Sequence, residues 1–220
     1  MVILPHETKI PGKSLLLGRN ARHEYLLAAM TLFLDRDGVV NERMPNDYVK
    51  HPDAWVPTEG LGEALQLLSI HFQRIVIVTN QAGIGKGLMT EADLAAVHAR
   101  MFAVAHAAGG RIDRVYHCPH RSDAGCSCRK PATGMAWLAV VDFPDIDFAQ
   151  AWMVGDSGSD MQFGQALGMR TVLIAGKSEE RFALATLPVD FRFDSLLAFA
   201  RFLGRPTASQ AIRPCPVSEF

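Results

Sequence analysis

Residues 31–38, with the sequence TLFLDRDG, join a short apolar run to a pair of acidic residues and a glycine. The run at residues 31–34 has the composition of a strand buried on both faces of a parallel sheet. Asp35 and Asp37 follow it directly. Because open parallel sheets bind ligands outside the carboxyl ends of their strands, this segment predicts a buried strand that brings two carboxylates to a binding edge.

The rest of the chain alternates between predicted strands and predicted helices. A segment at residues 74–78, β-branched at 75–78, ends in Thr79 and Asn80, and a Thr-Glu-Ala-Asp capping box at residues 90–93 opens a helix to about Ala108. We expect further strands at residues 114–117, 151–154 and 171–174, helices at 61–68, 135–141 and 160–167, and a last strand and helix within 191–203. This order predicts an α/β fold with a doubly wound parallel sheet.

The length of 220 residues, with 49% of them apolar, suits one domain rather than two. We expect this domain at residues 31–204, with an N-terminal extension at 1–30 and a polar, proline-bearing tail at 205–220. Both ends should be loosely attached. The apolar run at 26–34 is too short to span a membrane and ends in acidic residues, so a buried strand is favoured over a signal peptide.

Charge and composition exclude two classes of partner. Lysine and arginine total 22 against 23 acidic residues, and the formal net charge is -1. There is no general basic field to attract nucleic acid or an anionic membrane. We therefore expect neither as a partner, and a phosphorylated ligand must be held by a few local cations.

An Asp-x-Asp pair alone is more typical of a solvated turn or a helix cap than of a catalytic site. Here it has partners at other predicted strand ends. These partners are Thr79, Asn80, Lys130, Asp156 and Asp160. Their order along the chain matches the four motifs of the haloacid dehalogenase superfamily.

These residue types suit phosphoryl transfer to a carboxylate. A phosphomonoester dianion repels a carboxylate nucleophile, so we expect Mg²⁺ to be held by Asp35, Asp156 and the backbone carbonyl of Asp37. Asp35 would attack phosphorus, while Thr79 and Lys130 would stabilise the equatorial phosphoryl oxygens. Asp37 would protonate the leaving oxygen and later deprotonate the attacking water.

A second group of residues predicts a zinc site in a loop at residues 118–128. Three of the four cysteines lie here, in Cys118-Pro119-His120 and Cys126-Ser127-Cys128, and Cys215 lies in the tail. Three thiolates and one imidazole form a closed tetrahedral set, so this zinc should be structural. Free thiols or a disulfide are the alternatives, and metal ligation in a reducing cytoplasm is favoured over both.

The nearby histidines have ordinary structural explanations. His117 is expected at a strand end rather than as a fifth zinc ligand, because the four other residues complete the tetrahedron. His98 and His106 lie on the predicted helix after residue 90 and are expected to face solvent.

The quoted motifs resemble the D-glycero-D-manno-heptose 1,7-bisphosphate phosphatase family over roughly residues 31–176. The matching segments are DRDGVVN at 35–41, VTNQAGI at 78–84, the zinc-loop arms with the Arg-Lys-Pro that follows, and VGD at 154–156. This resemblance implies a capless haloacid dehalogenase-like fold. It also implies hydrolysis of the 7-phosphate through a phosphoryl-aspartate, in the synthesis of nucleotide-activated heptose for lipopolysaccharide or surface glycans.

The resemblance also assigns roles by position. It makes Asp35, Asp37, Thr79 and Lys130 catalytic, and Mg²⁺ and Zn²⁺ the cofactors. It implies a phosphorylated sugar as substrate, with contacts from Arg36, Asn46, Asp47, Tyr48, Asn80, Gln81, Lys86 and Arg129, the last toward the far phosphate. We expect a cytoplasmic monomer. The sugar anomer stays open, because Ser157, Lys86 and a short zinc loop depart from the family pattern.

Three other functions are compatible with parts of the sequence. Histidinol-phosphate phosphatase shares the fold, the motifs and a similar zinc loop, so only overall resemblance separates it. A zinc-stabilised binding module without catalysis is disfavoured because every catalytic side chain is present. A nucleic-acid end phosphatase is disfavoured by the charge balance.

Overall fold

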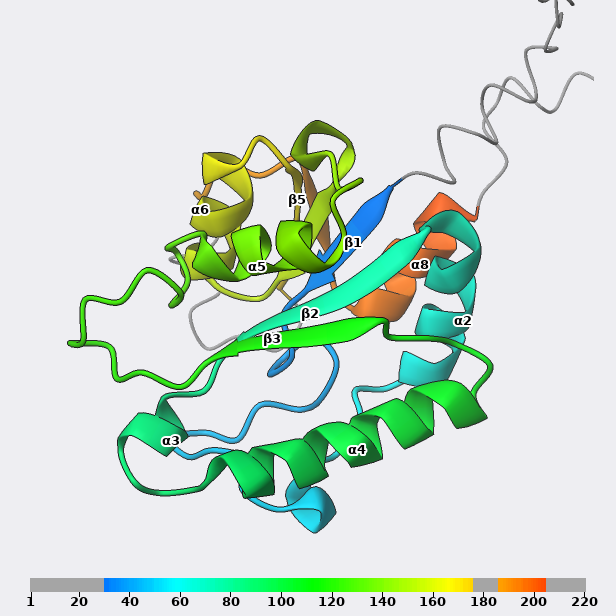
Figure 1. The fold of residues 1–220 in the computed structure, drawn as a ribbon. Coiled ribbons are helices and arrows are strands. Elements are labelled where there is room, and N and C mark those ends of the chain that lie inside the picture. Colours follow the sequence, from blue (N-terminus) through cyan, green and yellow to red (C-terminus); the bar gives the residue numbers. More distant parts are fainter. Residues whose placement is uncertain (1–29, 176–185, 205–220) are drawn as a thin grey trace, which may run out of the picture.

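A six-stranded parallel sheet forms the centre of the computed structural model, which describes residues 30–175 and 186–204 (Figure 1). The strands are β1 (Thr31–Leu34), β2 (Arg74–Asn80), β3 (Arg114–Cys118), β4 (Trp152–Gly155), β5 (Arg170–Ile174) and β6 (Phe191–Phe193). Their spatial order is β3-β2-β1-β4-β5-β6. The chain therefore winds outward from β1 in one direction and from β4 in the other, which confirms the predicted doubly wound fold.

Helices cover both faces of this sheet (Figure 1). One face carries α2 (Leu61–His71), α4 (Glu91–Ala107) and α8 (Leu196–Leu203). The other face carries α5 (Gly134–Asp142) and α6 (Gly158–Ala166). Short helical turns lie in the connections: η1 (Pro52–Ala54), α3 (Ala82–Gly85) and η2 (Phe148–Gln150).

Alternation along the central strands divides the core into two layers. In β1, Leu32 and Leu34 pack into the layer under α2, α4 and α8, while Phe33 packs under α5 and α6. All three side chains are fully buried. Because successive side chains of a strand point to opposite faces, a run that is apolar at every position fits a strand covered on both sides.

No inserted cap domain interrupts the described core. Between β1 and β2 the chain forms only η1 and α2, and between β2 and β3 only α3 and α4. The capless form of the fold is confirmed. Within the described residues, no helix is long and apolar enough to cross a membrane. The expected N-terminal extension, apart from Met30, and the expected tail with Cys215 lie outside the described residues.

Candidate active site and zinc centre

The carboxyl ends of β1, β2 and β4 converge on one polar pocket. Asp35 follows β1, Thr79 lies near the end of β2, and Asp156 follows β4. The pocket has a volume of about 320 Å³, within the range of small-ligand sites. Its polar lining residues are Asp35, Asp37, Arg43, Asp47, Tyr48, Thr79, Asn80, Arg129, Lys130, Ser157, Ser159 and Asp160.

A glycine lets the turn after β1 approach Asp156. Gly38 has a φ of 98°, and a Cβ at this position would lie 1.9 Å from Asp156 Oδ2. Only glycine combines this backbone angle with this close approach. Gly38, the last residue of the DRDG motif, is therefore needed to let the loop pack against the Asp156 carboxylate.

Lys130 is buried between two carboxylates. Its Nζ lies 2.6 Å from Asp35 Oδ1 and 2.6 Å from Asp160 Oδ1, and it also donates to the Val78 carbonyl at 2.6 Å. Burial raises the pKa of Asp35 to about 6, although the Lys130 ammonium acts in the opposite direction. Burial favours neutral Lys130, but the two carboxylates outweigh it and raise the lysine pKa to about 12. The lysine is thus held charged beside Asp35.

Asp156 adds a further carboxylate to this cluster. Oxygen atoms of Asp35, Asp156 and Asp160 lie within 4.8 Å of one another. Burial and the nearby Asp35 charge raise the pKa of Asp156 to about 8. Both oxygens of Asp160 face other groups, Oδ1 at 2.6 Å from the Lys130 ammonium and Oδ2 as acceptor from the Ser157 hydroxyl. Lys130 contacts only Oδ1 of Asp35, so Asp35 and Asp156 are the pair best placed for a divalent cation. Carboxylate oxygens are the hard ligands that Mg²⁺ prefers, and a bound Mg²⁺ would offset the repulsion between these closely spaced carboxylates.

Sequence reasoning missed Arg43, which lies at the pocket mouth. Its Nη2 is 2.8 Å from Asp156 Oδ1, and half of the side chain is exposed. The two residues are 113 positions apart, so no local pattern in the sequence indicates their contact.

Asp37 is held by hydrogen bonds on both carboxylate oxygens. Arg36 Nη2 lies 2.9 and 3.0 Å from the two oxygens, and Asn41 and Gln81 donate at 3.0 and 2.8 Å. Burial raises the pKa of Asp37, but the Arg36 charge and these hydrogen bonds outweigh it and hold the pKa below its usual value. Gln81 also donates to Thr79 Oγ1 at 2.8 Å, which leaves the Thr79 proton free for a ligand.

Three residues expected to contact the substrate bind other residues of the site. Arg36 and Gln81 are fully buried, and both donate hydrogen bonds to Asp37, so their observed contacts position that carboxylate. Asn80 exchanges hydrogen bonds with the Lys130 backbone at 3.0 and 3.1 Å. Its amide orients the lysine segment, although the residue lines the pocket.

The remaining expected substrate contacts lie at the mouth or outside it. Asp47, Tyr48 and Arg129 line the pocket, and Arg129 Nη1 is buried without a hydrogen-bond partner among the described residues. Asn46 is exposed with a φ of 57° and does not line the pocket. Lys86 is exposed, and its Nζ lies 5.4 Å from the centre of the Tyr48 ring. Arg129 is therefore the best-placed free cation of the predicted set.

The expectation that His98 faces solvent is wrong. Its side chain is buried, and its Nε2 lies 3.3 Å from Arg36 Nη1. The helical spacing of the apolar residues predicts this burial. His98 lies on the same face of α4 as Leu94, Val97 and Met101, and all four are buried. Burial, followed by the Arg36 charge, lowers the His98 pKa to about 3. His106 is exposed, as expected.

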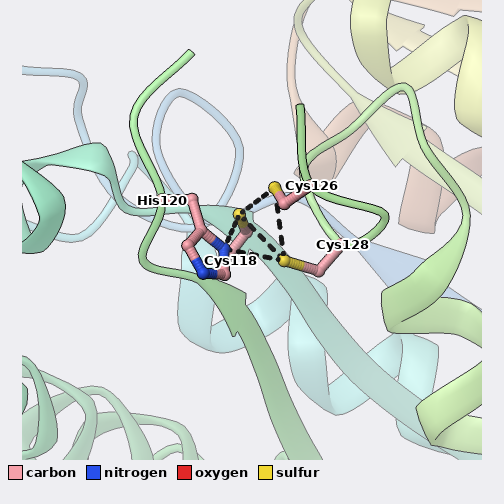
Figure 2. Close-up of side chains that lie close together, drawn as sticks. All are labelled: Cys118, His120, Cys126 and Cys128. Carbon is pink, nitrogen blue, oxygen red and sulfur yellow. Dashed lines mark hydrogen bonds between the residues drawn. The ribbon is translucent and has the colours of Figure 1, made fainter. Parts of the chain in front are cut away.

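The four expected zinc ligands converge at the end of β3 (Figure 2). Neighbouring ligand atoms are 3.2 to 3.6 Å apart, and the histidine atom is Nδ1. A tetrahedral zinc with these ligands would separate them by about 3.5–3.8 Å, whereas a disulfide would require about 2.05 Å. Cys118, Cys126 and Cys128 are free thiols, so the disulfide alternative is excluded. The donor set and its spacing fit Zn²⁺.

The zinc loop is connected to the catalytic residues through β2. Gln81 donates its backbone N–H to the Cys118 carbonyl at 2.7 Å, and the strand register places Asn80 beside Cys118. Arg129 and Lys130 follow Cys128 directly in the sequence. The loop thus fixes the start of the segment that carries both cations. His117 contacts Glu91 Oε2 at 2.9 Å and lies in β3, as expected of a strand residue.

Comparisons with known proteins place this geometry among phosphatases. The HAD-hydrolase-like family model matches residues 127–198. A D-glycero-beta-D-manno-heptose-1,7-bisphosphate 7-phosphatase of Pseudomonas putida is 38% identical over 173 residues, which cover 78% of this chain and 98% of the relative. A D-glycero-alpha-D-manno-heptose-1,7-bisphosphate 7-phosphatase of Mycobacterium tuberculosis is 36% identical over 180 residues, which cover 79% of this chain and 90% of the relative.

A solved structure shows the same architecture. The D,D-heptose 1,7-bisphosphate phosphatase of B. bronchiseptica, crystallised with magnesium and phosphate, superposes with a TM-score of 0.72 at 35% identity. The superposition covers 79% of this chain and 97% of that chain.

Proposed function

Because the chain belongs to the D-glycero-D-manno-heptose 1,7-bisphosphate 7-phosphatase family of haloacid dehalogenase-like hydrolases, we propose that it removes the 7-phosphate of this heptose bisphosphate. One observation carries the proposed mechanism. Asp35 lies in the pocket with a fixed ammonium 2.6 Å away, and Asp37, two residues on, lines the same pocket with its carboxylate held by hydrogen bonds. This arrangement provides a nucleophile and a separate acid-base group.

In the first step, Asp35 attacks phosphorus and the bond from phosphorus to the sugar oxygen breaks. The electron pair stays with the sugar oxygen, which takes a proton from Asp37 and leaves as the alcohol. Lys130 and the Thr79 hydroxyl stabilise the negative charge on the transferred phosphoryl oxygens. A phosphate dianion near Asp37 raises the pKa of that carboxyl and so favours the protonated form that this step requires.

In the second step, water attacks phosphorus and the phosphoryl-aspartate bond breaks. Asp37 accepts a proton from that water and is ready for the next turnover. Asp35 is regenerated as a carboxylate, and inorganic phosphate is released. The hydrogen bonds to Asp37 from Arg36, Asn41 and Gln81 suit this step, because they stabilise the carboxylate that acts as base.

The carboxylate cluster defines the metal requirement. Asp35 and Asp156, together with the Asp37 carbonyl, would hold Mg²⁺, which offsets the negative charge of the phosphate and of the buried carboxylates. Lys130 supplies the only buried ammonium beside Asp35 among the described residues. Lys130 and the half-exposed Arg43 are two cations beside three carboxylates, and this remaining negative charge supports a divalent cation as part of the active enzyme.

The proposal extends to specificity and setting. Arg129, with an unpaired and buried Nη1, would bind the phosphate that is not hydrolysed. Asp47 and Tyr48 would contact the sugar from the pocket mouth, and Asn46 and Lys86 would reach it only after movement of this rim. Three neighbouring cysteines without a disulfide fit a reducing compartment, so we place the enzyme in the cytoplasm, acting as a monomer in nucleotide-activated heptose synthesis.

Phosphate release from a substrate panel tests the proposal. The panel contains the α and β heptose 1,7-bisphosphates, because the two curated relatives are named for different anomers. Heptose 7-phosphate and histidinol phosphate complete it. We expect Mg²⁺-dependent turnover with the highest kcat/KM for one bisphosphate anomer, and a loss of at least about 10³-fold in Asp35→Asn. Preferred hydrolysis of histidinol phosphate would replace this function by the alternative one.

A further inference from the structure

Every polar atom of the Arg36 guanidinium faces one of two partners. Nε and Nη2 donate to Asp37, at 3.2 Å to Oδ1 from Nε and at 2.9 and 3.0 Å to the two oxygens from Nη2. Nη1 lies 3.3 Å from His98 Nε2. Arg36 is fully buried and His98 is buried, so this contact lies away from solvent behind the catalytic loop.

The contact fixes the state of the imidazole. A guanidinium has five N–H donors and no acceptor, so His98 Nε2 must accept the hydrogen bond through its lone pair. The ring is therefore neutral, with its proton on Nδ1. The depressed pKa of His98, caused by burial and then by the Arg36 charge, agrees with a neutral ring.

We propose that His98 is a positioning residue for catalysis. Its Nε2 accepts a hydrogen bond from Arg36 and so holds the guanidinium in place, and the guanidinium in turn orients the Asp37 carboxylate. This inference rests on the proposed acid-base role of Asp37. Arg36 and Asp37 are neighbours in the sequence, whereas His98 comes from α4 on the same face as α2. The helix therefore sets the geometry of the catalytic loop from outside it.

Loss of the acceptor has a defined consequence. A buried donor without a partner is costly, so the guanidinium would turn to find another acceptor. Each such rotation weakens the paired contacts to Asp37, and misplacement of a reacting group by about 1 Å costs up to about 100-fold in rate. The effect should be largest where proton transfer from Asp37 limits the reaction.

The test compares His98→Leu, which removes the acceptor, with His98→Gln, whose amide oxygen restores one. His106→Leu on the same helix is the control, because His106 is exposed. For each protein, kcat/KM is measured with Mg²⁺ on the heptose bisphosphate and on aryl phosphates of increasing leaving-group pKa, and thermal unfolding is followed in parallel. Poor leaving groups need the Asp37 proton most.

We expect His98→Leu to lose about 10- to 100-fold in kcat/KM on poor leaving groups and much less on good ones. His98→Gln should recover most of this loss, and His106→Leu should match the parent protein. If His98 had a purely structural role, His98→Leu would lower stability and would lower kcat/KM equally for all substrates. That result would overturn the inference, and so would a His98→Gln variant no more active than His98→Leu. If the leucine variant does not fold, His98→Asn, whose shorter side chain withdraws the acceptor, provides the same comparison.

Asp37→Asn separates this inference from the proposed function. If its kcat/KM falls steeply with leaving-group pKa but that of His98→Leu does not, the acid role stands and the role of His98 is refuted. If Asp37→Asn shows no such dependence, the acid role itself is wrong and the inference falls with it.

Discussion

Lys130 Nζ and Asp35 Oδ1 lie 2.6 Å apart in a site where both side chains are buried. Asp160 shares the same ammonium, so two carboxylates face one cation before a substrate arrives. Burial keeps the pKa of Asp35 near 6 in spite of this contact. The site is thus short of positive charge, and this shortage explains why lysine and a divalent cation are both needed for a dianionic substrate.

Lys130→Met should be severely destabilising and nearly inactive. Removal of one partner of a buried ion pair leaves its carboxylates uncompensated, at a cost of about 3–5 kcal/mol in the free energy of unfolding. The loss should be smaller with Mg²⁺ present, because the metal offsets part of the same charge. Thermal unfolding with and without Mg²⁺ measures this. Arg201→Met, which breaks an exposed ion pair with Glu63, should cost about 1 kcal/mol or less. Equal effects of the two substitutions would contradict the charge argument.

Gly38→Ala should weaken Mg²⁺ binding. The added Cβ would lie 1.9 Å from Asp156 Oδ2, so the loop or the carboxylate must move, and turnover should fall at least about 10-fold. Gly87→Ala is the matched control, since Gly87 also has a positive φ of 70° but has no atom within 4 Å of the new Cβ. The Mg²⁺ dependence of turnover measures the difference. An unchanged half-saturating Mg²⁺ concentration in Gly38→Ala would show that the close approach does not matter.

Much of the fold could be predicted because buried parallel strands and helix caps leave local signals. The run at residues 75–78 and the capping box of Thr90 and Asp93 are examples, and the structure contains both elements. Helix starts were less exact. The helix expected from Asp160 begins at Gly158, because Ser157 is its N-cap and Asp160 closes the capping box from inside the first turn.

The candidate site was predictable where its residues follow strands, as Asp35 and Asp156 do. Contacts made across the fold were not. Arginine side chains are usually exposed, so residue type alone would place Arg36 in solvent. In the structure Arg36 is buried and contacts Asp37 and His98 of α4. Arg43 contacts Asp156 across 113 positions of sequence. Residue type predicts chemistry, while the direction of a long side chain depends on packing that no local pattern contains.

Arg129→Ala should reduce the preference for a bisphosphate. A charge-assisted hydrogen bond to phosphate contributes about 1.5–3 kcal/mol, so KM for the heptose bisphosphate should rise about 10- to 100-fold. KM for the 7-monophosphate, which lacks the second phosphate, should change little. Arg121→Ala is the control, because Arg121 lies in the same loop but is exposed and paired with Asp123. A variant that keeps the full preference for the bisphosphate would refute the role of Arg129.

Loss of the zinc should loosen the segment that carries the substrate cations. The purified protein should contain about one Zn²⁺ per chain, with four protein ligands and no open position. Because metal-binding energy at such a site is also folding energy, Cys126→Ser and Cys128→Ser should each lower stability by at least about 2 kcal/mol. The zinc content should fall with it.

The serine variants should also impair substrate binding and turnover more than Mg²⁺ binding. Lys130 follows the last zinc ligand by two residues. Asp35 and Asp156 instead follow β1 and β4, which contribute no zinc ligand. We therefore expect a higher KM and lower kcat but no rise in the half-saturating Mg²⁺ concentration. Ser127→Ala, between the two cysteines, is the control and should keep its zinc, stability and turnover. Metal analysis, thermal unfolding and Mg²⁺ titration decide the matter together. Cysteine variants that retained full stability and activity, or a parent protein without zinc, would rule out a structural metal in this loop.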